Sequence, residues 1–182
     1  MRAVVYSSTG GPEVLRLVDR PEPSPGPGEV LVRVAVSGVN PTDWKARRGS
    51  APGQPPAFPE VVPNQDGAGT IEAVGLGVDS GRAGQRVWLW ESAWQRADGT
   101  AQELVAVPSG QAVGLPDAAS LDLGASLGIP ALTAHRCLTV GEEGPRRLAP
   151  SGLSGKNVLV AAGPAPWATP PSSWPAGRER RS

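Results

Sequence analysis

The polar segment NPTD, residues 40–43, follows the most regular strand pattern of the sequence, EVLVRVAVSGV at 29–39. The carboxamide of Asn40 and the carboxylate of Asp43 are candidate site groups at the end of that strand. Asn-Pro and Asp are also ordinary turn residues, so turn formation is the alternative explanation. The next residue, Trp44, has a ring that can stack on a flat substrate or simply cover the loop.

A second candidate group lies in the glycine-rich segment DGAG at 66–69. Asp66 adds another carboxylate, which we consider as a residue that reaches the same cleft. Gly67 and Gly69 are better explained by a bulge or by close backbone approach than by ligand binding.

Metal chemistry has few ligands available in this sequence. The chain has one histidine, His135, and one cysteine, Cys137, whereas a catalytic zinc needs three protein ligands of the Cys, His or carboxylate type. We interpret His135 as structural or exposed and Cys137 as a small buried apolar residue. A single cysteine permits no intrachain disulfide and fits a reducing, cytoplasmic compartment.

The composition argues against two classes of partner. Lys plus Arg and Asp plus Glu both number 17, and a nucleic-acid or membrane-surface binder would show a basic surplus. No apolar run approaches the roughly 18 residues of a membrane span. The start, MRAVVYSSTGG, lacks the apolar region of a signal peptide. We therefore expect neither nucleic acid nor membrane as a partner.

Short apolar runs between Gly and Pro turns predict many strands followed by helices. We expect strands at 1–6, 13–18, 29–39, 67–74, 85–90 and 100–107, and a loop with a short helical turn at 40–49. Residues 117–138 have helical patterning; we expect two short helices, capped by Asp117 and broken at 128–130. A buried strand is predicted at 156–160. This order predicts a mainly β fold with α, an antiparallel β domain leading into the start of an α/β unit.

Five stretches together resemble one known group of proteins: MRAVVYSSTGGPEVLRL, PGPGEVLVRVAVSGVNPTDWKARRG, FPEVVPNQDGAGTIEAVGLGV, AQELVAVP and LGIPALTAHRCL. In this order they resemble the medium-chain dehydrogenase/reductase superfamily, specifically its zinc-free quinone oxidoreductase (zeta-crystallin-like) branch. The resemblance implies a GroES-like partial β-barrel at 1–116. It also implies connecting helices and the first strand of an incomplete Rossmann domain at 117–160.

The resemblance further implies an activity and the residues that serve it. Members of this branch transfer a hydride from NADPH to a quinone or an enone, and Asn40 stands where zinc-containing relatives carry a cysteine. Asn40 and Asp43 are then the expected catalytic residues, and Asn40 and Thr133 the expected cofactor contacts. Trp44 and Asp66 are the expected substrate contacts. For Thr133 the alternative is a helix threonine that bonds to its own backbone.

The segment after Val160 departs from the pattern of a dinucleotide-binding domain. Such a domain continues with G-x-G-x-x-G, which lets a helix N-terminus hold the pyrophosphate, whereas this chain has AAGPAPW with prolines that lack N–H groups. Read one base out of frame, Trp167 and the alanine after it force a glycine codon, and Trp174 and the proline after it force an alanine codon. The hidden frame accommodates a glycine fingerprint opening an amphipathic helix. We therefore expect 161–182 to be a frameshifted, disordered tail.

These expectations make the chain an N-terminal fragment of an NAD(P)H-dependent quinone oxidoreductase that is inactive by itself. The alternative is a non-catalytic GroES-like binding or oligomerisation module. In either case the helical face at 117–138 would lack its packing partner and expose apolar surface. Homo-oligomers or aggregates are therefore expected.

Overall fold

The computed structural model describes residues 1–142 and 144–160. The predicted frameshifted tail at 161–182 lies outside the described residues. The chain divides into two compact units, Met1–Ile129 and Pro130–Ser182. The separate prediction of a domain at 1–116 and a linking segment at 117–160 stays a prediction.

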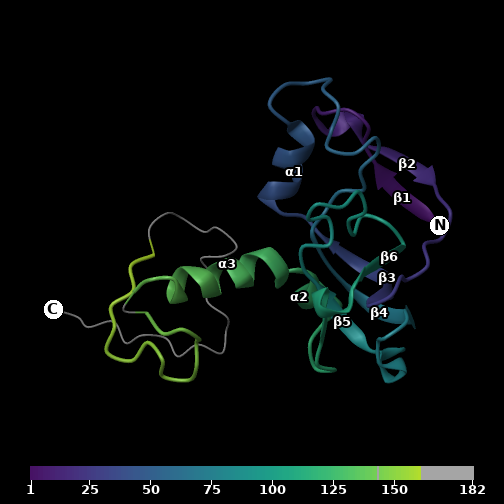
Figure 1. The fold of residues 1–182 in the computed structure, drawn as a ribbon. Coiled ribbons are helices and arrows are strands. Elements are labelled where there is room, and N and C mark those ends of the chain that lie inside the picture. The colour runs from purple at the N-terminus through teal and green to yellow at the C-terminus, as the bar shows by residue number, and fades with distance from the viewer. Residues whose placement is uncertain (143, 161–182) are drawn as a thin grey trace. The chain divides into compact units, whose positions relative to one another are not determined.

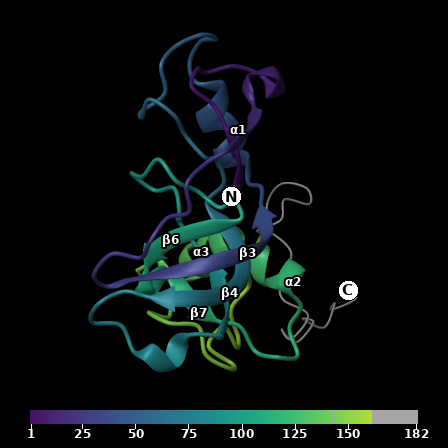
Figure 2. The same ribbon diagram turned by 90° about the vertical axis from the view of Figure 1, so that its right-hand side faces the viewer.

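The first unit contains two antiparallel sheets (Figure 1). A hairpin pairs β1 (Arg2–Val5) with β2 (Arg16–Asp19). The larger sheet has the order β6-β3-β4-β5-β7, and Figure 2 labels β6, β3, β4 and β7 in this order across the sheet. Its strands are β3 (Glu29–Gly38), β4 (Asp66–Val74), β5 (Arg86–Leu89), β6 (Leu104–Pro108) and β7 (Ala112–Gly114). The predicted mainly β fold is confirmed.

The core of this sheet consists mostly of β-branched side chains, which suit a pleated, buried surface. Its buried members are Val30, Val32, Ile71, Val87, Leu89, Val105, Val107 and Ala112. A smaller cluster of Ala3, Val5 and Val62 lies under the hairpin. Because these side chains come from strands far apart in sequence, the core holds the ends of β3 and β4 in fixed register.

Close backbone approach explains the glycines of β4, as the sequence predicted. A Cβ atom at Gly69 would collide with the carbonyl oxygen of Arg33, and one at Gly67 would lie 3.0 Å from Thr100 Cγ2. The β3–β4 register also shifts between Val34 and Val36, which marks a bulge.

Several predicted elements differ from the observed ones. The predicted loop at 40–49 contains the helix α1 (Pro41–Arg48), because proline suits the first helical turn. The predicted strand at 13–18 is split into a 3-10 turn (Pro12–Val14) and β2, and the one at 100–107 begins only at β6. The short strand β7 was missed, since three residues carry no periodic signal.

Two helices follow the larger sheet, and both begin at other residues than the sequence predicts. In α2 (Leu121–Ala125) the N-cap is Ser120, whose Oγ accepts from the backbone N–H of Leu123, so the predicted cap at Asp117 is wrong. Two helices are present, as predicted, but the break between them lies at 126–127 rather than at 128–130, where α3 (Gly128–Thr139) begins. Its Pro130 stands in the first turn, where a missing N–H costs nothing.

The predicted buried strand at 156–160 is not a strand in the structure. No β-ladder among the described residues includes 157–160, and the side chain of Leu159 is 91% exposed. A strand forms only with a neighbour to bond, so an apolar run alone does not produce one. Within the described residues, no helix combines the length and the apolar character needed to cross a membrane.

Candidate functional site

Three of the predicted site residues meet where β3 ends and β4 begins. The antiparallel register places Gly38 opposite Asp66, so the chain enters α1 beside the first residue of β4. Asn40, Asp43 and Asp66 are all buried there, and we call them the carboxyl cluster. Sequence reasoning named these residues, and the strand register brings them together.

Hydrogen bonds connect the members of the carboxyl cluster directly. Asn40 Nδ2 donates to Asp66 Oδ2 at 2.7 Å, and the backbone N–H of Asn40 donates to Asp43 Oδ2 at 2.6 Å. Asp43 Oδ1 accepts from the backbone N–H of Gln65 at 3.2 Å. Both oxygens of Asp43 therefore serve the backbone, which joins the start of α1 to the segment before β4.

Asp66 has the most unusual electrostatic surroundings of the cluster. Its Oδ2 accepts a second bond, from the backbone N–H of Ile129 at 2.7 Å, while its Oδ1 is buried and has no hydrogen-bond partner among the described residues. Burial raises the pKa of Asp66 to about 6; the bonds from Ile129 and Asn40 oppose the shift, and Asp43 and Glu91 add to it. Burial also raises the pKa of Asp43. The cluster thus holds a carboxyl group that changes charge near pH 6.

Hydroxyl and amide side chains that the sequence analysis did not identify form a chain of hydrogen bonds that ends at the backbone of Asp66. Thr100 Oγ1 donates to the carbonyl oxygen of Asp66 at 2.5 Å and lies 2.8 Å from Ser37 Oγ. Ser37 Oγ in turn accepts from Asn64 Nδ2 at 2.9 Å. No local pattern marks Thr100, because only the folded register brings it to a residue 34 positions away.

Trp44 lies on α1, next to the buried Asp43. Its side chain is 40% exposed, and the ammonium of Lys45 lies 5.7 Å from the ring centroid. An exposed indole beside a polar cluster offers a flat surface for stacking. A substrate contact at Trp44 stays a prediction.

The remaining candidates belong to the second unit. The side chains of Thr133, His135 and Cys137 on α3 are exposed. The burial predicted for Cys137 is therefore wrong, because a helix position is buried only where another element packs on it, and the thiol of Cys137 is exposed. A cofactor contact at Thr133 stays a prediction.

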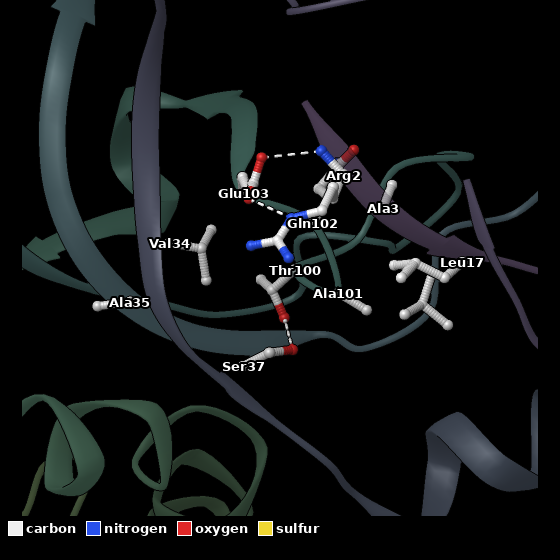
Figure 3. A pocket seen from close by; sticks show the side chains of 11 residues that line it. Arg2, Ala3, Leu17, Val34, Ala35, Ser37, Thr100, Ala101, Gln102 and Glu103 are labelled. Carbon is white, nitrogen blue, oxygen red and sulfur yellow. Dashed lines mark hydrogen bonds and ion pairs between the residues drawn. The ribbon is translucent and has the colours of Figure 1, made fainter. Parts of the chain in front are cut away.

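A separate hollow of about 380 Å³ lies between the β1–β2 hairpin and β3 (Figure 3). Its rim carries the ion pair between Arg2 and Glu103, with Arg2 Nε 2.9 Å from Glu103 Oε1. Ser37 and Thr100 line its floor and connect it to the carboxyl cluster. None of the predicted site residues lines this hollow. Among the described residues, no three His, Cys, Asp or Glu side chains are grouped as metal ligands would be.

Comparisons with known proteins point to one group. Residues 26–117 match the family model described as the alcohol dehydrogenase GroES-like domain. The chain is similar to the synaptic vesicle membrane protein VAT-1 homolog of Rattus norvegicus, with 36% identity over 140 residues, which is 76% of this chain and 33% of that protein. It is also similar to the quinone oxidoreductase of the same species, with 37% identity over 139 residues, which is 76% of this chain and 40% of that protein.

Solved structures give the same result. A mycobacterial protein complexed with NADPH superposes with a TM-score of 0.69 at 33% identity, covering 79% of this chain and 42% of that one. Escherichia coli quinone oxidoreductase complexed with NADPH gives a TM-score of 0.66 at 29% identity, covering 76% of this chain and 40% of that one. The chain thus spans well under half the length of these relatives.

Proposed function

Because the chain belongs to the alcohol dehydrogenase GroES-like domain family, in the quinone oxidoreductase branch of the medium-chain dehydrogenase/reductase superfamily, we propose that it is the N-terminal part of an NAD(P)H-dependent quinone oxidoreductase. In the proposed reaction NADPH supplies a hydride and solvent supplies a proton to a quinone or an enone. The proposed compartment is the cytoplasm, and the proposed partner is a small molecule.

The observation that carries the proposal is the fixed carboxamide of Asn40 at the end of β3. A buried amide held by Asp66 is a preorganised hydrogen-bonding group, which suits the orientation of a nicotinamide or a quinone oxygen. Asp43 holds the backbone of Asn40, so its proposed part is to fix the start of α1. Trp44 is the proposed stacking surface for the quinone, and Thr133 a further proposed cofactor contact.

NADPH fits the described residues only in part. Within the carboxyl cluster, the carboxamide of Asn40 is the group proposed for the nicotinamide end of the cofactor. The residues that match a pyrophosphate loop, 161–167, lie outside the described residues. We therefore derive no hydride step for this chain by itself, and we expect it to bind NADPH weakly or not at all. Micromolar binding in a fluorescence titration of the 182-residue chain would contradict that expectation.

A quinone titration tests the proposed substrate site. Duroquinone is the suitable probe, because its ring is fully substituted and the exposed thiol of Cys137 therefore does not add to it. We expect saturable quenching of tryptophan fluorescence that is lost in Trp44→Phe. Trp94→Phe is the matched control, because Trp94 is also exposed but lies outside the cluster. Equal quenching in both variants would contradict the proposed site.

One observation favours a second candidate, a non-catalytic module that pairs with another copy. The first unit exposes apolar side chains. Val39, the residue before Asn40, is 71% exposed, and Leu123 of α2 is 50% exposed. Apolar surface of this kind favours association. Size-exclusion chromatography decides between the candidates, because a stable, defined oligomer without quinone binding would favour the module.

A further inference from the structure

One carboxyl oxygen joins three separate segments of the first unit. Asp66 opens β4, Asn40 leads into α1, and Ile129 stands in the first turn of α3. Asp66 Oδ2 accepts from Asn40 Nδ2 and from the Ile129 N–H, both at 2.7 Å. The segments are separated by 26 and 63 positions in the sequence, so no local interaction substitutes for this contact.

The carboxyl group of Asp66 is enclosed, which leaves the substrate contact predicted for this residue without an exposed group to make it. Asp66 is 0% exposed. A Cβ atom at Gly128 would collide with its Oδ1, and one at Gly38 would lie 3.1 Å from its Cβ and collide with the carbonyl oxygen of Ala125. The backbone is therefore packed around Asp66 without room for a side chain. A group so enclosed acts on a ligand only through a neighbour, and Asn40 is the neighbour that it bonds.

We propose that Asp66 is a positioning residue, whose Oδ2 orients the carboxamide of Asn40 and holds the backbone N–H of Ile129 at the β3–β4 junction. A carboxylate accepts hydrogen bonds and donates none, so it bonds only the NH₂ end of the carboxamide. The oxygen of Asn40 is thereby turned away from Asp66. The meaning of this orientation for catalysis rests on the proposed function, but the contact itself does not.

The change of charge at Asp66 with pH can be used to detect its two hydrogen bonds. Its pKa lies at about 6 because of burial, and the charged groups that face it are Asp43 from α1 and Glu91 from the loop after β5. Both carry negative charge and both raise the pKa. The nitrogen and hydrogen nuclei of each group that donates a hydrogen bond to Oδ2 should therefore sense the titration of Asp66 near pH 6.

Nuclear magnetic resonance of the ¹⁵N-labelled 182-residue chain tests the proposal. We expect the side-chain NH₂ of Asn40 and the backbone N–H of Ile129 to shift with a common midpoint near pH 6. Asp66→Asn leaves an oxygen for both donors but no charge, so both titrations should vanish while the fold persists. Glu91→Gln is the matched control, because it removes one neighbouring charge; both titrations should remain, with a lower midpoint.

Asp66→Ala removes the acceptor as well as the charge. We expect amide hydrogen exchange at Ile129 to accelerate about tenfold or more, in line with the loss of a charge-assisted bond. In Asp66→Asn the exchange should remain slow. Different midpoints for Asn40 and Ile129, or titrations that survive in Asp66→Asn, would overturn the proposal.

A duroquinone titration connects the contact to the proposed site. Glu91→Gln should bind the quinone as the wild type does, whereas Asp66→Ala should bind more weakly because the carboxamide of Asn40 is no longer oriented. Unchanged binding in Asp66→Ala would remove the positioning role. If the wild type binds no duroquinone while the two resonances titrate together, the proposed function fails and the Asp66 contact stands.

Discussion

Residues 1–129 and 130–160 both contain runs of apolar side chains, but these side chains have different surroundings. In the first unit Val30, Val32 and Val105 are completely buried by neighbouring strands. In the second, Val158 and Leu159 are largely exposed and pair with no strand among the described residues. The two runs look alike in the sequence, and the difference lies in partners supplied by distant segments. Burial here is a property of the sheet rather than of the run.

The largest expected difference between the two units is the change in the free energy of unfolding when one apolar side chain is truncated in each. Ile71→Ala leaves a cavity in the sheet core and should lower the free energy of unfolding by about 2–5 kcal/mol. Leu159→Ala should change it by less than about 0.5 kcal/mol, because the side chain is exposed. Urea unfolding followed by circular dichroism measures both. Similar losses in the two variants would show that residues 156–160 are packed.

A second test uses the buried charge of the first unit. The pKa of Asp66 is raised from 3.8 to about 6, so the folded chain binds this proton more tightly than the unfolded chain. The stabilisation is complete below about pH 4 and is lost as the pH rises through 6, by about 3 kcal/mol. The difference in free energy of unfolding between wild type and Asp66→Asn should change by that amount between pH 4 and pH 8.

The pH experiment has an internal comparison. Glu142→Gln is the matched control, because it removes an exposed carboxyl group outside the first unit, and we expect it to keep the pH dependence of the wild type. A wild-type curve parallel to that of Asp66→Asn would contradict the burial of Asp66.

A third test adds a methyl group to one glycine in each unit. Gly38→Ala would drive a Cβ atom into the carbonyl oxygen of Ala125, and we expect a loss of about 1–3 kcal/mol. Gly141→Ala meets no atom within 4 Å and should be close to neutral. Thermal unfolding measures both. Tolerance of Gly38→Ala would show that the β3 end and α2 separate easily.

The smallest effect is expected from modification of Cys137. Its exposed thiol should react with Ellman's reagent in the folded chain at nearly the rate measured in urea. The free energy of unfolding should not change after modification. Reaction only in urea would indicate that α3 is covered in solution by another copy of the chain.

Much of the fold was predictable where strands carry strong patterns. The strand at 29–39 was predicted almost to its ends, because its apolar and β-branched residues leave few alternatives. The polar side chains of 40–49 show no apolar face and predict a loop with only a short helical turn, whereas the helix α1 extends over Pro41–Arg48. The cap at Ser120 was missed because Asp117 is an equally good cap by residue type.

The candidate site was predictable by residue type but not by geometry. Asn40, Asp43 and Asp66 were named from the sequence, whereas the bond from Asn40 to Asp66 depends on the β3–β4 register. Thr100 and Ile129 complete the surroundings of Asp66 and carry no sequence signal. Contacts across 34 and 63 positions follow from tertiary packing, which local patterns do not encode.

The sequence by itself determined the family, the strands of the sheet and the residues able to form hydrogen bonds at the end of β3. These follow from side-chain type and from short-range periodicity, which act before folding is complete. Only the tertiary structure decided that Asp66 is enclosed and that the run at 156–160 is not a strand. Both outcomes depend on segments that are distant in the sequence. Asp66 is desolvated only because such segments pack around it, and a run of apolar residues becomes a strand only where another strand pairs with it.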